Sequence, residues 1–179
     1  MRVLSLLYSN PAPLLTIADA SLQWTPQIAV SHEAVFLEIG KCRKLYREPI
    51  LLSRLRSLNK RLGIKPKVAV ANDLPTSLAM ARFQVPQREL LPVEALSDYF
   101  SPWEPTDALN LMITLLKKLG VYRLADFLKL PAKTLSSRFG SEGVLALQKI
   151  NEAAQIHWPV FRPPELVIEK MEFDAARSL

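Results

Sequence analysis

The feature that most constrains the fold of this chain is a pair of short apolar runs separated by a polar turn. Residues 27–30 and 34–39 are rich in β-branched and aromatic side chains, and residues 31–33 between them are mostly polar. Side chains of this kind favour strands, and so short a connection joins two neighbouring strands into an antiparallel hairpin. The chain must therefore contain a sheet, and the apolar side chains of that sheet need a covering layer.

The sequence after the hairpin predicts what covers the sheet. Leucines recur at helical spacing and predict a helix over residues 48–62. Its buried stripe is expected to comprise Leu51, Leu55, Leu58 and Leu62. Pro49 falls in the first turn, where proline is tolerated, and Gly63 follows where a left-handed cap belongs. With an apolar run at residues 67–71 and a helix over residues 76–83, we predict an α+β fold whose helices cover one face of the sheet.

The start of the chain and its second half extend this picture. Residues 2–8 are apolar almost throughout and predict a central first strand, whereas residues 11–24 are expected to be short and irregular. Leucine spacing makes the second half helical, with a helix over residues 107–119 that Thr106 caps and Gly120 ends. We place a sheet domain at residues 1–90, a helical domain at 91–160 and a linker with the start of a further domain at 161–179.

Composition narrows the class of protein. The 179 residues suffice for a real core, and no apolar run is long enough to cross a bilayer. The single cysteine, Cys42, excludes an internal disulfide and indicates a reducing compartment such as the cytoplasm. Because the chain has only two histidines, a zinc site is not expected, and we expect no cofactor.

Positive charge is concentrated in one stretch. The net charge is +6, yet residues 41–67 hold ten lysines and arginines against one acid, Glu48. Such a stretch can meet phosphate or an acidic protein surface, and it can equally be a solvated helix face. Four of its cations are our candidates for binding a protein partner: Arg54, Arg56, Lys60 and Arg61.

Several short motifs follow one another in a distinctive order. They lie at residues 36–46, 62–71, 121–131 and 133–140. The first runs through Glu38, Gly40 and Cys42, and the last ends in Arg138-Phe139-Gly140. In order and spacing they resemble the palm and thumb of Y-family (translesion) DNA polymerases, over residues 27–173. The resemblance implies a reduced palm-like sheet followed by a small helical, thumb-like domain of the helix–hairpin–helix type.

The resemblance also marks what a working polymerase has and this chain lacks. The family's first strand carries a metal-binding aspartate and its hairpin two adjacent carboxylates, because acids from neighbouring strands must hold two Mg²⁺ ions. Here residues 2–8 contain no acid, and the turn reads Ser31-His32-Glu33. Glu33 remains in the turn, and Glu38 stands where the family has a structural aspartate. We regard both only as vestigial candidates for metal binding. We therefore predict no polymerase activity, and we match no fingers subdomain to residues 11–24.

The thumb motif retains some of the residues that could contact DNA. Residues 103–106 stand where the family has a glycine-containing turn that grips phosphate, and here proline and glutamate occupy that turn. The second turn of the thumb motif, by contrast, keeps the family's glycine as Gly120. The candidates for DNA contact are Lys117, Lys118, Arg123, Lys133 and Arg138. Each could instead be a helix-end cation that the helix dipole stabilises.

The end of the chain resembles the tether to the family's little-finger domain. Residues 157–164 are rich in aromatic residues and proline, and we expect Trp158 and Phe161 to pack on the thumb. Residues 165–173 alternate like a strand, and we expect the rest of that domain to be missing.

These expectations define the functional hypotheses. The leading one is a non-catalytic, translesion-polymerase-like accessory or scaffold protein in the DNA damage response and mutagenesis, with a protein partner and weak, sequence-independent DNA binding. The alternative is a protein–protein interaction module that binds no DNA and turns the basic face of residues 41–67 toward an acidic partner. A residual nuclease or nucleotide-binding enzyme is disfavoured by the lack of clustered carboxylates. No membrane partner is expected.

Overall fold

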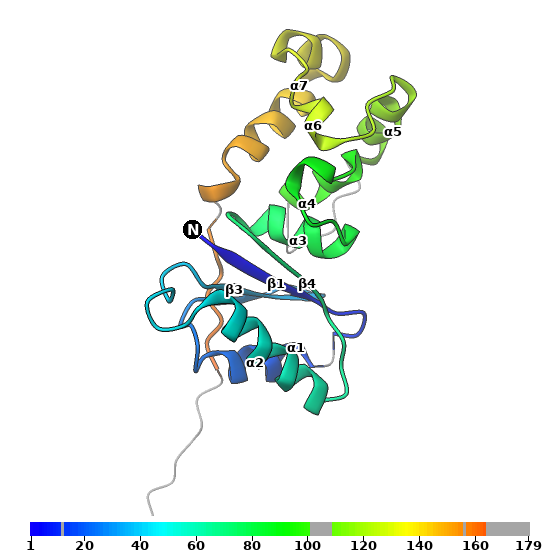
Figure 1. Ribbon diagram of the computed structural model, residues 1–179. Helices are drawn as coiled ribbons and strands as arrows, with labels where there is room; N and C mark the ends of the chain where they lie inside the picture. Colours follow the sequence, from blue (N-terminus) through cyan, green and yellow to red (C-terminus); the bar gives the residue numbers. More distant parts are fainter. Residues whose placement is uncertain (12, 101–108, 156, 164–179) are drawn as a thin grey trace, which may run out of the picture.

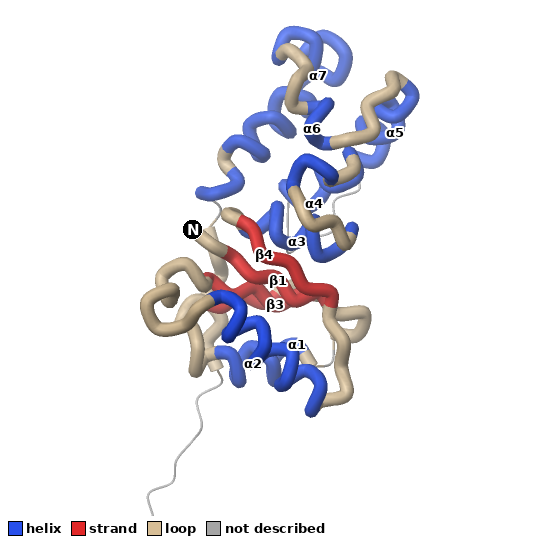
Figure 2. The backbone as a smooth tube through the Cα atoms, viewed as in Figure 1, coloured by secondary structure: helices blue, strands red, loops and turns tan. Residues whose placement is uncertain are grey.

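The fold is built on a four-stranded antiparallel sheet. The computed structural model describes residues 1–11, 13–100, 109–155 and 157–163. The strands lie in the order β2-β3-β1-β4, of which Figure 1 and Figure 2 label β3, β1 and β4. Their bounds are Val3–Leu7 for β1, Ile28–Val30 for β2, Ala34–Glu38 for β3 and Lys67–Ala71 for β4. Strand β1 is central, as predicted, and all of its residues are buried.

The hairpin formed by β2 and β3 has the predicted position. Ser31 closes its turn, since the backbone N–H of Ser31 donates to the carbonyl of Ala34 at 2.9 Å. Strand β3 pairs with β1 along the full length of both. The pairing continues past β1, where the N–H of Tyr8 donates to the carbonyl of Glu33 at 2.9 Å. The turn of the hairpin therefore lies beside the end of β1.

Helices cover both faces of the sheet. Helices α1 (Leu14–Ser21) and α2 (Glu48–Arg61) pack on one face, in a cluster that includes Leu4 of β1. Helix α3 (Leu74–Phe83) packs on the other face, in a cluster that includes Val3 (Figure 1). The expectation that helices cover a single face was wrong, because successive side chains of a strand point to opposite faces and a strand as apolar as β1 needs cover on both.

Helix α1 also corrects the expectation of an irregular segment at residues 11–24. It begins just after Pro13, and prolines at the start of a segment are compatible with a helix that follows them. Its buried residues recur at the spacing of a helical face: Leu14, Ile17, Ala18 and Ser21. This helical spacing was present in the sequence, but it extends over only eight residues.

Helix α2 has nearly the predicted bounds. Pro49 lies in its first turn, and Gly63 adopts a φ of +69° after its end. Leu51 and Leu55 are buried against the sheet. Leu62 was wrongly placed in the buried stripe: it is 43% exposed, because the helix ends at Arg61 and the chain no longer follows the helical face.

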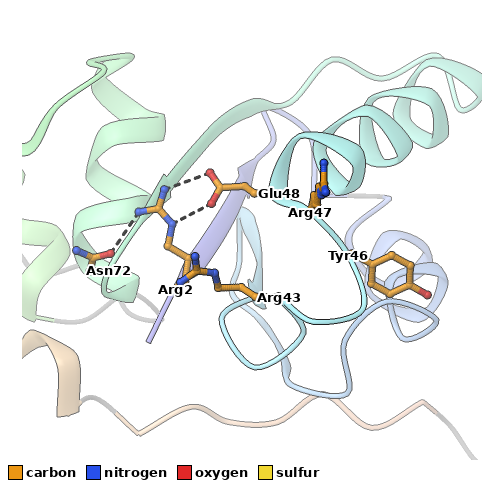
Figure 3. Close-up of a pocket in the computed structure, with 6 residues that line it drawn as sticks. All are labelled: Arg2, Arg43, Tyr46, Arg47, Glu48 and Asn72. Atoms are coloured by element: carbon orange, nitrogen blue, oxygen red, sulfur yellow. Dashed lines mark hydrogen bonds and ion pairs between the residues drawn. The ribbon is translucent and has the colours of Figure 1, made fainter.

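Arg2 fastens the start of α2 to the sheet (Figure 3). Its Nε and Nη2 donate to the two carboxylate oxygens of Glu48 at 3.0 and 3.1 Å, and its Nη1 donates to Oδ1 of Asn72 at 3.2 Å. The next residue, Asp73, caps α3, since its Oδ1 accepts from the N–H of Thr76 at 2.8 Å. These bonds fix where both helices begin relative to β1 and β4.

The second half of the chain is helical, as predicted. Its elements are η1 (Arg88–Leu90), η2 (Val93–Ala95), α4 (Leu96–Phe100), α5 (Asn110–Lys118), α6 (Leu124–Phe127), α7 (Ala132–Asn151) and η4 (Ala153–Gln155). Gly120 ends α5 with a φ of +82°, and Gly140 divides α7 into two parts with a φ of +61°. The first part thus ends in Arg-Phe-Gly, as expected. Among the described residues, no helix is long and apolar enough to cross a membrane.

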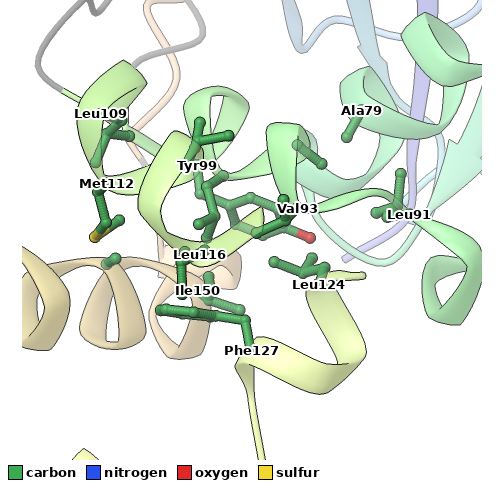
Figure 4. Close-up of a cluster of buried hydrophobic side chains, with 14 of the residues drawn as sticks. Ala79, Leu91, Val93, Tyr99, Leu109, Met112, Leu116, Leu124, Phe127 and Ile150 are labelled. Atoms are coloured by element: carbon green, nitrogen blue, oxygen red, sulfur yellow. The ribbon is translucent and has the colours of Figure 1, made fainter. Parts of the chain in front are cut away.

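One buried cluster joins these helices to α3 (Figure 4). It contains Ala79 of α3, Tyr99 of α4, Leu116 of α5 and Phe127 of α6. The hydroxyl groups of Tyr99 and Thr76 also share a hydrogen bond of 2.7 Å. Packing is therefore continuous across the boundary expected near residue 90, and the division into domains stays a prediction.

The described tail lies on the sheet. Trp158 packs in the cluster on the α3 side, and Phe161 packs against the cluster on the α1–α2 side. The N–H of Phe161 donates to the carbonyl of Ile28 at 2.7 Å. The expectation that both aromatic side chains pack on the thumb-like helices was wrong, because the outer edge of β2 offers a hydrogen-bond acceptor between two apolar faces. Three expectations lie outside the described residues: the turn at 103–106, the cap at Thr106 and the strand at 165–173.

Candidate functional site

The candidate site lies where the end of β1 meets the turn of the hairpin. The resemblance to Y-family polymerases implied metal-binding acids at this place. Strand β1 ends in Leu6 and Leu7, Tyr8 follows in the sequence, and none of these residues is an acid. The hairpin turn supplies Glu33, whose side chain is about one-quarter exposed.

An arginine holds two carboxylates together at this end of the sheet. Nη2 of Arg82 donates to Oε1 of Glu33 at 2.6 Å and to Oδ1 of Asp98 at 2.9 Å, and its Nε donates to the same oxygen of Asp98 at 3.1 Å. Nε2 of His32 lies 3.4 Å from Oε1 of Glu33. The three charged side chains come from the hairpin turn, α3 and α4, so the cluster joins the sheet to the first of the later helices.

Asp98 is the most buried member of this cluster. Its side chain is 6% exposed, against 35% for Arg82. Burial raises the pKa of Asp98 to about 6, although the charge and hydrogen bonds of Arg82 work in the opposite direction. Burial by itself would lower the pKa of Arg82, but Asp98 and Glu33 raise it. The cluster therefore holds a permanent cation between a partly exposed carboxyl, Glu33, and a buried one, Asp98.

Sequence analysis found Glu33 in this cluster and missed the other two. Arg82 lies 49 residues from Glu33 and 16 from Asp98, so no local spacing connects them. One signal was available: Asp98 lies, with Glu94, among the apolar residues of 91–100, and an acid buried there requires a partner.

Glu38, the second vestigial candidate, has a structural role. It lies at the far end of β3 from Glu33, about 17 Å away at the usual rise of a strand. Its carboxylate accepts from the backbone N–H groups of Gly40 at 3.0 Å, Lys41 at 3.1 Å and Arg2 at 3.4 Å. The two glutamates cannot share a metal ion. Within the described ranges, no group of three or more His, Cys, Asp or Glu side chains could hold one.

The five candidates for DNA contact lie on successive helices or at their ends, and all are exposed. Lys117 and Lys118 end α5, Arg123 precedes α6, and Lys133 and Arg138 lie in the first part of α7. Nζ of Lys117 donates to Oε1 of Glu94 at 2.8 Å, which raises the pKa of Lys117. The other four form no ion pair with any residue that the structure describes.

The four candidates for partner binding on α2 divide between its two flanks. Arg54 and Arg61 line one hollow, and the guanidinium of Arg54 lies 5.2 Å from the centroid of the Tyr46 ring. Arg56 and Lys60, one helical turn apart, line a different groove beside β4. The basic stretch therefore does not form the single face that the sequence suggested.

A further basic pocket, of about 450 Å³, was not predicted (Figure 3). It lies at the start of α2 and is lined by Arg2, Arg43 and Arg47, with Glu48 and Asn72. Sequence analysis missed it because Arg2 and Glu48 lie 46 residues apart. The pocket carries positive charge at the end of the sheet that is opposite to Glu33.

The fold of this chain is similar to those of solved DNA polymerases. A DinB-family error-prone DNA polymerase from Sulfolobus solfataricus matches with a TM-score of 0.57 at 18% identity, covering 84% of this chain and 47% of its own. A ternary complex of Dbh matches with a TM-score of 0.58 at 11% identity, covering 87% of this chain and 67% of its own. The fold is thus that of a Y-family polymerase-like palm fragment with its helical continuation.

The sequence points to one type within that class. Protein ImuB of Caulobacter vibrioides, in each of two strains, is 28% identical over 170 residues, which is 92% of this chain and 37% of the ImuB chain. No protein-family model matches the chain. The chain thus resembles Y-family polymerases in fold and proteins of the ImuB type in sequence, and it spans little more than a third of the length of these ImuB relatives.

Proposed function

We propose that this chain is a non-catalytic accessory or scaffold protein in DNA damage tolerance, with weak, sequence-independent affinity for DNA. Its likeness to ImuB and to Y-family polymerases supports a polymerase-like role in that setting. The non-catalytic part of the proposal rests on the site at the end of β1. The DNA-binding part rests on the later helices. A cytoplasmic location stays a prediction.

The ion pair between Arg82 and Glu33 is the observation that carries the non-catalytic role. Two-metal phosphoryl transfer needs several carboxylates that are free to bind cations and that come from neighbouring strands. Here β1 supplies none, and Oε1 of Glu33 lies 2.6 Å from a guanidinium. A Mg²⁺ ion would have to displace an arginine that a second, buried carboxyl also holds. The arrangement favours an ionic clasp over metal catalysis.

Primer extension tests this part directly. A labelled primer–template with all four nucleotides and Mg²⁺ is incubated with the protein, beside an active Y-family polymerase as the positive control. We expect no extension by this chain. Extension that disappears in Glu33→Ala would overturn the proposal, because it would assign metal binding to that carboxylate.

The positions of two thumb cations support contact with DNA. A cation in the last turn of a helix is stabilised by the helix dipole, which accounts for Lys118 without any ligand. Arg123 and Lys133 instead lie at the starts of α6 and α7, where the dipole disfavours a cation. Solved relatives of this fold include insertion and post-insertion complexes of Dbh DNA polymerase. A phosphate backbone is therefore the first ligand to test.

Fluorescence anisotropy of labelled single-stranded and primer–template DNA, at two salt concentrations, measures this affinity. Binding should weaken steeply with added salt and change little with sequence, because phosphate contacts release counterions. The double variant Arg123→Glu/Arg138→Glu should abolish it. The matched control, Arg43→Glu/Lys44→Glu, makes the same change in net charge on an exposed loop of the sheet domain and should keep most of the affinity. Equal loss in both variants would contradict a thumb-like DNA interface.

The second candidate function is a protein-interaction module that binds no DNA. The groove beside Arg56 and Lys60 favours it, since that groove combines an apolar floor with a basic rim. Absence of DNA binding at low salt, in a protein that unfolds cooperatively, would select this function over the first.

A further inference from the structure

The two outer edges of the sheet differ. At the β2 edge, the N–H of Phe161 bonds the carbonyl of Ile28, so the tail lies against this edge. At the other edge, β4 is the last strand, and no described segment pairs with its outer side. Val68 of this strand is 36% exposed, whereas every residue of β1 and β3 is buried.

The register identifies which backbone groups of β4 point outward. In an antiparallel sheet, successive residues of a central strand bond to opposite neighbours. Arg2 and Tyr8 bond to β3, so the odd-numbered residues of β1 bond to β4. Their partners are Lys67, Ala69 and Ala71. Val68 and Val70 therefore direct their N–H and C=O groups toward the open edge.

The same alternation holds at the covered edge. The carbonyl of Gln27 accepts from Glu38 of the neighbouring strand at 3.0 Å, and the next residue, Ile28, bonds outward to Phe161. The β2 edge thus already accepts an extended segment through one outward carbonyl. The β4 edge presents two residues with the same orientation.

A groove accompanies each face of β4. On the α2 side, a groove of about 590 Å³ has an apolar floor that includes Leu6, Leu52 and Leu55, with Val68 at its border. On the α3 side, a second groove of similar volume is lined by Met80 and Val85, among others. Because side chains of a strand alternate between faces, a strand added to β4 would place alternate side chains in the two grooves.

The rims of these grooves carry charge of one sign. Their charged residues are Arg56, Lys60, Lys65 and Lys67, and no acid lines either groove. The buried amide of Asn59 is already satisfied: Oδ1 accepts from the hydroxyl of Tyr8 and Nδ2 donates to the carbonyl of Leu55, both at 2.8 Å. This surface is therefore suited to an extended segment that carries both apolar and acidic side chains.

We propose that the β4 edge is the docking site for an extended, acidic segment of a partner protein, which adds to the sheet as a further antiparallel or parallel strand. The outward groups of Val68 and Val70 bond its backbone. The grooves take its apolar side chains, and Arg56, Lys60 and Lys65 meet its acids. The inference rests on the proposed scaffold role, because it specifies how such a protein would hold a partner. It does not depend on DNA binding by the later helices.

The probe is a fluorescein-labelled peptide that alternates valine with glutamate and aspartate, titrated with the full chain in an anisotropy experiment. Two changes to the protein should each weaken binding at least about tenfold, a loss of about 1.4 kcal/mol. Val68→Pro removes an outward N–H and leaves the bonds between β4 and β1, a substitution that edge strands tolerate. Arg56→Glu/Lys60→Glu reverses two charges on the rim without touching the strand.

The chain offers a matched control on the same helix. Arg54→Glu/Arg61→Glu makes the same change in charge on the other flank of α2, away from the groove, and should bind the peptide as the unchanged protein does. Amide hydrogen exchange is a second readout: the peptide should slow exchange at Val68 and Val70 and leave Ala69 unchanged. If Val68→Pro fails to fold, the charge variants and the exchange pattern still decide.

Three results would overturn the inference. The first is no peptide binding by the unchanged protein. The second is equal loss of affinity in the two double charge variants, which would indicate long-range attraction in place of a docked strand. The third is displacement of the peptide by unlabelled single-stranded DNA with the same dependence on Arg56 and Lys60, which would make the groove a phosphate site. Failure of DNA binding by Arg123→Glu/Arg138→Glu, with peptide binding intact, would leave the inference standing.

Discussion

Nη2 of Arg82 lies 2.6 Å from Oε1 of Glu33, although these two residues are 49 positions apart in the palm-like sequence. The same guanidinium nitrogen reaches Asp98 of α4 at 2.9 Å. The place where a polymerase of this fold would hold metal ions is thus an ionic clasp between the hairpin, α3 and α4. Its energetics can be measured apart from any activity.

Arg82→Ala should destabilise the protein by about 2–4 kcal/mol, because it leaves the buried carboxyl of Asp98 without a partner. Urea unfolding followed by circular dichroism measures the change. The double variant Arg82→Ala/Asp98→Asn should recover much of the loss, since no buried charge remains. As a control, Lys129→Ala breaks the exposed pair with Asp126 and should cost less than about 0.5 kcal/mol. Equal effects of the two alanine variants would contradict a buried clasp.

Stability should fall as the pH rises from about 4 to about 7 through the contribution of Asp98. Burial raises the pKa of Asp98 in the folded protein to about 6, above its value in the unfolded chain. Between the two pKa values the folded state binds more protons than the unfolded state, so the free energy of unfolding decreases with pH. The contribution is of order 2–3 kcal/mol. Urea titrations across this range measure it, and Asp98→Asn should remove it. A pH profile that is identical in Asp98→Asn would contradict the assignment.

Glu38→Ala should destabilise the fold by about 1–3 kcal/mol and leave DNA affinity unchanged. The carboxylate accepts from the backbone N–H groups of Gly40 and Lys41, and among the described residues the N–H of Lys41 has no other acceptor, whereas that of Gly40 is shared with the carbonyl of Arg2 at 3.3 Å. A vestigial metal ligand without a structural role would show the opposite pattern, with little loss of stability. Glu142→Ala, a change at an exposed acid in α7, is the control for the loss of one negative charge.

What the sequence could predict was the local part of this structure. The hairpin, the cap at Gly63 and, to within one residue, the bounds of α2 each depend on neighbouring residues, and each was confirmed. The clasp at Arg82 and the open edge of β4 depend on which strands and helices meet. Nothing in local spacing encodes that arrangement. The tail was misplaced for the same reason, since the edge that receives Phe161 exists only once β2 has joined the sheet.

The resemblance to a family predicted the type of fold but not how its parts are used. The palm-like motif around Gly40 was recognised as a pattern, and the structure supplies its physical reason. A Cβ atom on Gly40 would lie 2.8 Å from Oε1 of Glu38 and 3.0 Å from the backbone nitrogen of Arg2. Position 40 therefore favours glycine as long as Glu38 keeps its hydrogen bonds to this turn.

Gly140→Ala should cost more stability than Gly63→Ala, although neither added methyl group meets another atom within 4 Å. Gly63 has a left-handed φ of +69°, where an alanine costs about 1–2 kcal/mol. Gly140 combines a φ of +61° with a ψ of −143°, a region that is essentially restricted to glycine and costs about 1–3 kcal/mol or more for other residues. Asparagine separates the two cases, because it tolerates the left-handed region but not the second one. Gly63→Asn should therefore be nearly neutral in urea unfolding, and Gly140→Asn should be as costly as Gly140→Ala. A tolerated Gly140→Asn would mean that the two parts of α7 straighten into one helix, and the break after Arg138-Phe139 would then not be a requirement of the fold.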